Sequence, residues 1–208
     1  MKKVFLFFLL STVLVSADNL QRLESGNETF LDAKSIQKVR EKFIGYQAPF
    51  AACLACADSR VAPEILFSQS IGDLFVVRNA GNVIDDVVIA SLEYAVDVLQ
   101  VPMLVIIGHQ NCGAVSGALQ LTLQETKVQP SSLNAIFKKI QPSLDNVVDS
   151  SEITQSKRDQ AVKDNAIYQL DVLISKSSVI QKKIRKKELT VYALYYEMDT
   201  GKVFELNH

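Results

Sequence analysis

The sequence contains no tryptophan, only two histidines and only three cysteines in 208 residues. Three cysteines cannot form a closed set of disulfides, because one is always left over. Lysine and arginine number 22 against 23 acidic residues, a net charge of −1, so nothing indicates a nucleic-acid backbone as a partner. Hydrophobic residues make up 48% of the chain, which excludes a disordered or collagen-like protein. Any metal-binding or nucleophilic chemistry must therefore use a small stock of histidine and cysteine.

The first residues are typical of a secretory signal peptide. Two lysines precede an apolar run over residues 4–15, and small residues end at Ala17. The run is short for a membrane span, which needs about 20 residues. We expect cleavage after Ala17, so that residues 1–17 are a signal peptide and residues 18–208 form one mature domain. That domain would be secreted across the inner membrane, most simply into a bacterial periplasm. The alternative is an uncleaved N-terminal anchor, and no other segment is suited to cross a membrane.

Residues 18–46 predict a helical arm at the N-terminus. Apolar side chains recur at helical spacing over residues 29–43, and a shorter helical stretch over residues 19–24 ends at a Ser-Gly-Asn break. The arm has too little apolar surface to fold alone. We therefore expect it to lie against the main body or a partner subunit.

The remainder predicts an α/β fold with a central, mostly parallel sheet flanked by helices. Uninterrupted apolar runs over residues 50–56, 74–77 and 103–107 are typical of strands buried on both faces. Helices alternate with these strands, which favours parallel pairing. The expected helices cover residues 85–99, 113–123, 133–147 and 155–177, and a strand over residues 189–196 leads into a C-terminal hairpin.

Cys56, His109 and Cys112 follow two of the predicted strands, where they would meet at one edge of the sheet. Two thiolates and an imidazole suit Zn²⁺ and leave a fourth position for water. Zinc lowers the pKa of bound water to about 7, which supplies hydroxide near neutral pH. Asp58 and Arg60 lie just after the first ligand, so the carboxylate can accept a hydrogen bond from that water while the guanidinium holds it.

Cys53 permits two interpretations. In an apolar run it is most simply a small core residue. It also forms a Cys-x-x-Cys spacing with Cys56, which is a redox motif in proteins of oxidising compartments. A redox interpretation gives His109 and Cys112 no role, and a purely structural zinc site is a further alternative.

Four segments together resemble the β-class carbonic anhydrases. They are CADSR at residues 56–60, GDLFVVRNAGN at 72–82, SLEYAV at 91–96 and GHQNCGA at 108–114. The resemblance is dense from Gln47 to Ala118 and weaker through Asn165 and the final hairpin. Together with the apparent signal peptide, it is that of an exported bacterial form.

This resemblance implies an enzyme, a zinc lyase, that hydrates CO₂ reversibly to bicarbonate and a proton by attack of zinc-bound hydroxide. It implies one Zn²⁺ per chain on Cys56, His109 and Cys112. It implies Asp58 and Arg60 as the catalytic pair, with Asp58 as a fourth zinc ligand in members that close the site. The implied substrate-binding residues are Gln47, Phe75, Ala80, Gly81 and Tyr94. Members of the family assemble from dimers, so we expect a homodimer or a dimer of dimers.

One alternative of another class stays open at this point. A zinc-stabilised binding module without activity would keep Cys56, His109 and Cys112, but would have no need of Asp58, Arg60 or Gln47. Measuring CO₂ hydration together with metal content separates the two.

Overall fold

The structure is a computed structural model that describes residues 19–124, 132–148 and 152–207. The predicted signal peptide, residues 1–17, lies outside the described residues. The chain divides into two compact units, the first ending at Tyr46 and the second beginning at Gln47. Among the described helices, none is long and apolar enough to cross a membrane.

The first unit is helical, as predicted, but its break lies elsewhere. Residues 19–32 form one continuous helix across Gly26, and the helix α2, Lys34–Lys42, follows after Ala33. The prediction of a break at residues 25–27 is therefore wrong. An exposed glycine lowers the stability of a helix by only about 1 kcal/mol, which is too little to end it here. No residue of α2 is buried, so the apolar side chains of this unit have no core of their own.

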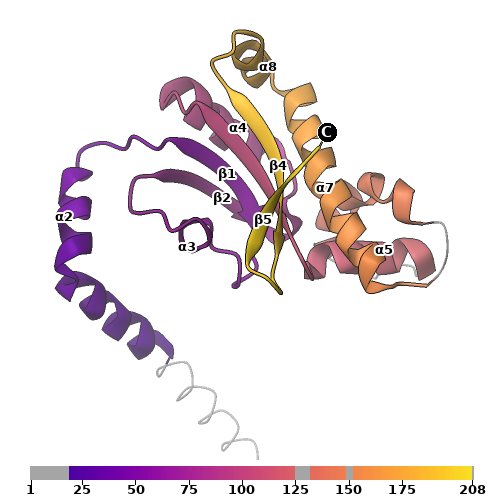
Figure 1. Ribbon diagram of the computed structural model, residues 1–208, viewed down its shortest axis with the longest axis horizontal. Coiled ribbons are helices and arrows are strands. Elements are labelled where there is room, and N and C mark those ends of the chain that lie inside the picture. The colour runs from indigo at the N-terminus through magenta and orange to yellow at the C-terminus, as the bar shows by residue number, and fades with distance from the viewer. Residues whose placement is uncertain (1–18, 125–131, 149–151, 208) are drawn as a thin grey trace, which may run out of the picture. The chain divides into compact units, whose positions relative to one another are not determined.

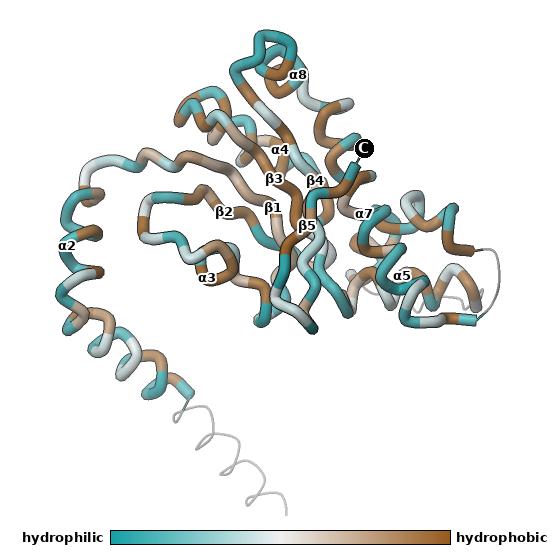
Figure 2. The backbone as a smooth tube through the Cα atoms, in the orientation of Figure 1, coloured by the Kyte–Doolittle hydropathy of each residue, from teal (hydrophilic) through white to brown (hydrophobic). Residues whose placement is uncertain are grey.

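The second unit is built on a five-stranded sheet in the order β2-β1-β3-β4-β5. The strands are β1 (Ala51–Cys56), β2 (Leu74–Asn79), β3 (Met103–His109), β4 (Thr190–Glu197) and β5 (Lys202–Leu206). The first four in this order run parallel, and β5 returns antiparallel to β4 (Figure 1). The predicted α/β fold with a mostly parallel sheet and a C-terminal hairpin is confirmed. The central strands β1 and β3 are hydrophobic along their length (Figure 2), which is typical of strands buried on both faces.

Helices cover one face of this sheet. Leu54 of β1 and Ile106 of β3 pack there against Leu170 and Leu173 of α7 (Gln155–Lys176). α4 (Asp86–Glu93) and α8 (Ser178–Arg185) complete the layer. A second apolar cluster joins α7 to α5 (Gly113–Gln124) and α6 (Leu133–Ile140) beside the carboxyl ends of the strands.

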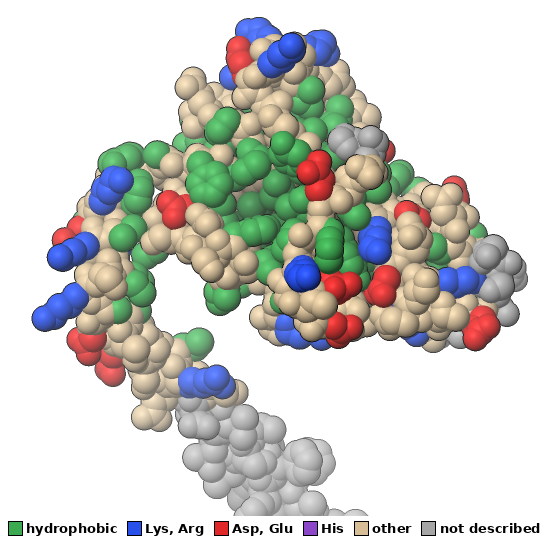
Figure 3. All heavy atoms as spheres, in the orientation of Figure 1, with side chains coloured by type: hydrophobic (Ala, Val, Ile, Leu, Met, Phe, Trp, Pro, Cys, Tyr) green, Lys and Arg blue, Asp and Glu red, His purple; other side chains and the backbone are tan. Residues whose placement is uncertain are grey.

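The other face of the sheet is open. Cys53, Ala55, Val105 and Ile107 point to that side, where a groove of about 410 Å³ follows the strands. Figure 3 shows apolar side chains gathered over this face. Among the described residues, only a short helix, α3 (Pro63–Leu66), and the side chains around it pack against part of this face.

Three predicted helices differ from the observed ones. The helix expected over residues 85–99 is α4 followed by a π-helical turn, η2 (Tyr94–Val98). The one expected over 133–147 ends at Ile140, because Pro142 follows, and two 3₁₀ turns replace it, η3 (Gln141–Ser143) and η4 (Asp145–Val147). The one expected over 155–177 ends at Lys176, where Ser177 caps the separate helix α8. The turn η1 (Ala80–Asn82) was not predicted at all.

Candidate metal centre

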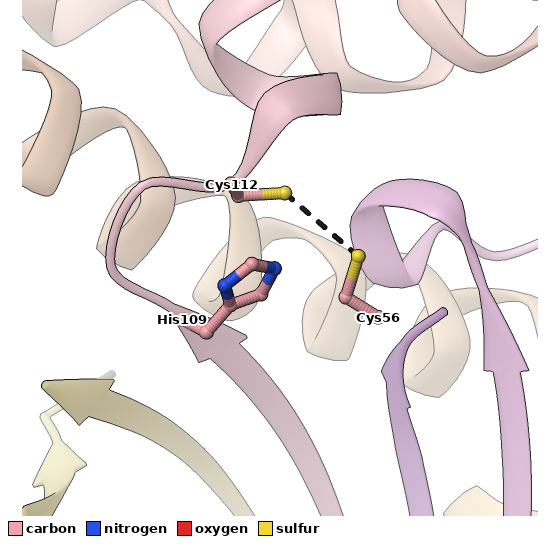
Figure 4. A group of neighbouring side chains, drawn as sticks. All are labelled: Cys56, His109 and Cys112. Atoms are coloured by element: carbon pink, nitrogen blue, oxygen red, sulfur yellow. Dashed lines mark hydrogen bonds between the residues drawn. The ribbon is translucent and has the colours of Figure 1, made fainter. Parts of the chain in front are cut away.

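Cys56, His109 and Cys112 lie together at the carboxyl edge of the sheet. Cys56 is the last residue of β1 and His109 the last of β3, and the two strands are parallel neighbours. Cys112 follows in the short loop before α5. All three side chains are buried, and their ligand atoms lie within 4.8 Å of one another. Figure 4 shows the two sulfurs and a ring nitrogen of His109 facing a common space.

The spacing of this group fits a tetrahedral zinc site. The sulfurs of Cys56 and Cys112 are 3.9 Å apart. Two thiolates each about 2.3 Å from one zinc ion at a tetrahedral angle would be about 3.8 Å apart. The sulfur atoms are therefore already at the separation that the metal requires.

The imidazole of His109 is also oriented to bind a metal ion. Its Nδ1 lies 3.0 Å from the carbonyl oxygen of Gln110, so the Nδ1–H donates and the lone pair is left on Nε2. That Nε2 is buried and has no hydrogen-bond partner among the described residues. A buried polar atom without a partner is costly, and a metal ion satisfies it. The donor set and its geometry thus fit Zn²⁺.

Backbone from η1 supports the first ligand. The Gly81 N–H donates to the Cys56 sulfur at 3.3 Å. Gly81 has a φ of 77°, and a Cβ there would lie 2.9 Å from Ile140. Glycine is therefore required at this position for both its conformation and its close packing.

The two sulfurs are electrostatically different. Hydrogen bonding from Cys112 and from the Gly81 N–H lowers the pKa of the Cys56 thiol below its usual range, against the effect of burial. Hydrogen bonding to Cys56, together with burial, raises the pKa of the Cys112 thiol.

Asp58 and Arg60 form the predicted pair beside this group. Arg60 Nε donates to Asp58 Oδ1 at 2.9 Å and Arg60 Nη2 to Oδ2 at 2.7 Å, while the Arg60 backbone N–H donates to Oδ1 at 3.0 Å. This bidentate contact holds the pKa of the Asp58 carboxyl well below its usual range. The side chain of Arg60 is 56% exposed and that of Asp58 is 18% exposed.

Arg78 is a part of the site that our sequence analysis did not assign. Its Nε donates to the Cys56 carbonyl at 3.0 Å and its Nη2 to the Asp58 carbonyl at 2.7 Å. One guanidinium from β2 therefore fixes the backbone that presents both side chains. The residue lies within the 72–82 segment, but nothing in its local pattern distinguishes it from a charge at a strand end.

Gln110 is a second unassigned residue. Its side chain donates to Asp199 Oδ2 at 2.9 Å and accepts from the Asp199 backbone N–H at 3.1 Å. Its own N–H donates to the Tyr196 carbonyl at 2.9 Å. The carbonyl that receives the His109 Nδ1–H is thus fixed by the C-terminal hairpin.

The five predicted substrate-binding residues are not gathered in one place. Gly81 and Ala80 lie beside Cys56, in the turn after β2. Phe75 and Tyr94 pair with each other, with ring centroids 6.1 Å apart, but Phe75 is four residues before the end of β2, or about 13 Å along the strand. Gln47 is exposed and precedes the opposite end of β1 from Cys56. Within one chain, Gln47, Phe75 and Tyr94 therefore lie away from the metal-binding group.

Cys53 is a core residue. It is 1% exposed in the apolar layer of the open sheet face, whereas Cys56 belongs to the cluster on the other side. All three cysteines are free. Opposite orientation on one strand removes the redox interpretation of the Cys53–Cys56 spacing.

Comparison with known proteins agrees with this geometry. Residues 51–203 match the family model described as carbonic anhydrase. Carbonic anhydrase 2 of Mycobacterium tuberculosis is 35% identical over 191 residues, which cover 89% of this chain and 90% of that protein. The chain belongs to the carbonic anhydrase family, in its β class. It is a zinc enzyme for the reversible hydration of CO₂, as predicted.

Solved structures of β-carbonic anhydrases have the same fold. The β-carbonic anhydrase CcaA superposes with a TM-score of 0.80 at 28% identity, over 91% of this chain and 88% of its own. A tetrameric β-carbonic anhydrase from the ascomycete Sordaria macrospora superposes with a TM-score of 0.79 at 24% identity, over 92% of this chain and 98% of its own. The predicted assignment to the β class is confirmed.

Proposed function

We propose that this carbonic anhydrase works through a metal centre held by Cys56, His109 and Cys112, with Asp58 and Arg60 orienting the water that reacts. The observation that supports this most is the pair of sulfurs at tetrahedral spacing beside a buried, unpartnered His109 Nε2 among the described residues. When bound, zinc acidifies a water molecule so that hydroxide is available near neutral pH. The overall reaction joins CO₂ and water to give bicarbonate and one proton.

Asp58 accepts a hydrogen bond in this scheme and not a proton. Its carboxylate stays ionised because Arg60 stabilises the charge and holds the pKa low. A carboxylate of low pKa is a poor base near neutral pH, but it is a good acceptor that fixes the orientation of a water hydrogen. The released proton then leaves through water or buffer. Apart from the ligand His109, the only other histidine is His208.

The open form of the site is the resting form in this proposal. Both carboxylate oxygens of Asp58 are engaged by Arg60, so Asp58 has to leave that pair before it can act as a fourth metal ligand. The contact between the two side chains therefore supports a position left free for water.

Gln47, Phe75 and Tyr94 serve the metal centre of a second copy. They lie away from the metal-binding group of their own chain, and Tyr94 is 44% exposed. A pocket of two aromatic rings suits a nonpolar substrate, and an amide suits bicarbonate. The site is then complete only in a dimer.

A homodimer, or a dimer of dimers, also accounts for two uncovered apolar surfaces. The groove along the open sheet face is lined by side chains such as Leu74, Met103 and Leu194. The first unit exposes Leu23 and Leu31, with no core to bury them. Exchange of residues 19–46 between two copies would cover both surfaces. Leu31→Glu should then shift the mass measured by light scattering towards the monomer, whereas a monomeric wild type would contradict this assembly.

Export is the remaining part of the proposal. A basic start, an apolar run and small residues at Ala17 support cleavage at that point and a periplasmic location. N-terminal sequencing of the protein recovered from the periplasmic fraction should begin at Asp18. Recovery only of chains that retain residues 1–17 would contradict it.

The catalytic proposal is tested by rate and metal content on the same sample. Asp58→Asn should lower the CO₂ hydration rate constant kcat/KM by about 10-fold or more while retaining one zinc per chain, because residues that orient a metal site typically contribute 10–100-fold. Asp97→Asn is the matched control, since it removes the same charge from an ion pair with Lys183 elsewhere. Metal present with no hydration at pH 8.5 in the wild type would overturn the catalytic proposal. Full turnover in Asp58→Asn would remove Asp58 from it.

A further inference from the structure

The turn that contacts Cys56 is held in place by a helix remote in sequence. The Gly81 N–H donates to the Cys56 sulfur at 3.3 Å, and the Gly81 carbonyl accepts from Asn165 Nδ2 at 3.0 Å. Asn165 lies on α7, 84 residues further along the chain. Gly81 is therefore bonded on one side to the metal ligand and on the other side to α7.

Asn165 is itself fixed by a second buried amide. Gln169, one helical turn further along α7, donates from Nε2 to Asn165 Oδ1 at 3.1 Å and to the Lys139 carbonyl at 3.0 Å. Gln169 Oε1 accepts from the Ile84 N–H at 2.8 Å. Asn165 is 0% exposed and Gln169 is 1% exposed. Each polar atom of these two buried amides has a partner, which fixes one orientation of each amide, because any other leaves a polar group without a partner.

We propose that Asn165 is a positioning residue for the metal centre: by holding Gly81, it keeps the Gly81 N–H on the Cys56 sulfur and limits the charge that this thiolate donates to the metal. The inference rests on the zinc site proposed above. A hydrogen bond to a thiolate withdraws electron density from it, so the metal stays more electron-poor and acidifies water more strongly. Asn165 touches neither substrate nor metal and acts through the Gly81 backbone.

The test replaces Asn165 by leucine, which has the same number of side-chain heavy atoms with the same branching and no donor. The first readout is the cobalt-substituted protein, whose ultraviolet thiolate-to-metal charge-transfer band should move to longer wavelength as Cys56 becomes the stronger donor. The second is zinc affinity by chelator competition, which should fall by about 10-fold as the ligand loses its fixed orientation. The third is the midpoint of the pH–rate profile, which should rise by about half a pH unit.

Ser177→Ala is the matched control. Ser177 is also fully buried, and its hydroxyl donates to Glu93 at 2.5 Å and accepts from the Ile180 N–H at 3.1 Å. It lies at the start of α8, away from the metal-binding group. Its loss should lower thermal stability but leave the cobalt band, the zinc affinity and the pH midpoint unchanged.

The outcomes separate a positioning role from a structural one. If Asn165→Leu is destabilised but has the wild-type band and pH midpoint, as expected of Ser177→Ala, the proposal is overturned. If Asn165→Leu does not fold, Asn165→Ala gives the same comparison, and unchanged spectra there also overturn it. A wild type that binds cobalt but does not hydrate CO₂ would contradict the proposed function, while the band positions would still decide the role of Asn165.

Discussion

Cys53 and Cys56 belong to the same strand, three residues apart, and differ in the sheet face they occupy, in their hydrogen-bond partners and in the pKa of their thiols. Cys53 points into an apolar layer, and burial raises the pKa of its thiol to about 12. Cys56 points to the other side, where hydrogen bonds from Cys112 and the Gly81 N–H lower the pKa of its thiol. The alternation of side chains along a strand therefore separates an inert thiol from a reactive one.

The difference shows that burial alone does not decide the character of a cysteine. Both residues are at most 5% exposed. The Cys112 thiol and the Gly81 N–H stabilise the Cys56 thiolate by hydrogen bonding. At Cys53 the negative charge of Glu64 raises the pKa further, beyond the effect of burial. The hydrogen-bond partners available on each face of the sheet therefore distinguish a metal ligand from a core residue.

Alanine at each position should give the largest contrast. Cys56→Ala removes a metal ligand, so bound zinc and CO₂ hydration should fall by more than about 100-fold, since residues behind the ligands already contribute 10–100-fold. Cys53→Ala should keep one zinc per chain and activity within about twofold, and lose about 1–2 kcal/mol of stability. Elemental analysis and stopped-flow hydration assays measure both. Equal losses of zinc and activity in the two variants would contradict the assignment of Cys56 as a ligand and Cys53 as a core residue.

Alkylation of the metal-free protein should separate the same thiols kinetically. At pH 8 a thiol with a pKa of about 12 is thiolate in about one molecule in ten thousand. We expect iodoacetamide to modify Cys56 at least about 100 times faster than Cys53, as measured by peptide mass spectrometry. Zinc should protect Cys56, and the zinc-loaded protein serves as the control. Comparable rates for the two thiols would contradict the raised pKa of Cys53.

The raised pKa of Cys53 should also make the free energy of unfolding fall at alkaline pH, an effect smaller than the two above. The folded chain keeps the Cys53 proton up to about pH 12, whereas the unfolded chain loses it near the ordinary value of 9.0. Stability that is complete below pH 9 therefore falls as the pH rises, by up to about 1.4 kcal/mol per pH unit. Urea unfolding of the zinc-loaded protein at pH 8.5 and 10.5 should show a decrease that is about 1–2 kcal/mol larger in the wild type than in Cys53→Ala. Parallel decreases would mean that Cys53 titrates normally.

The arrangement of Cys56, His109 and Cys112 was predictable because it follows from topology. Apolar runs identify β1 and β3, and parallel neighbours end at the same edge, so their last residues meet. The contacts that refine the site were not predictable. The contact between Gly81 and Asn165 joins residues 84 positions apart, and that between Gln110 and Asp199 joins residues 89 positions apart. A polar contact between residues so distant in the chain leaves no periodic pattern in the sequence. The cap at Ser177 was missed because the helical spacing of α7 continues into α8.

The C-terminal hairpin has a consequence for the order of folding. The carbonyl that fixes the His109 ring belongs to Gln110, which depends on Tyr196 and Asp199 near the end of the chain. Contacts of such long sequence separation form late, because a large loop must first be closed. A growing or partly unfolded chain can therefore hold both thiols before its imidazole is oriented. We therefore expect zinc capture to be a late event whose timing is set by the last strand pair, although that pair provides no ligand.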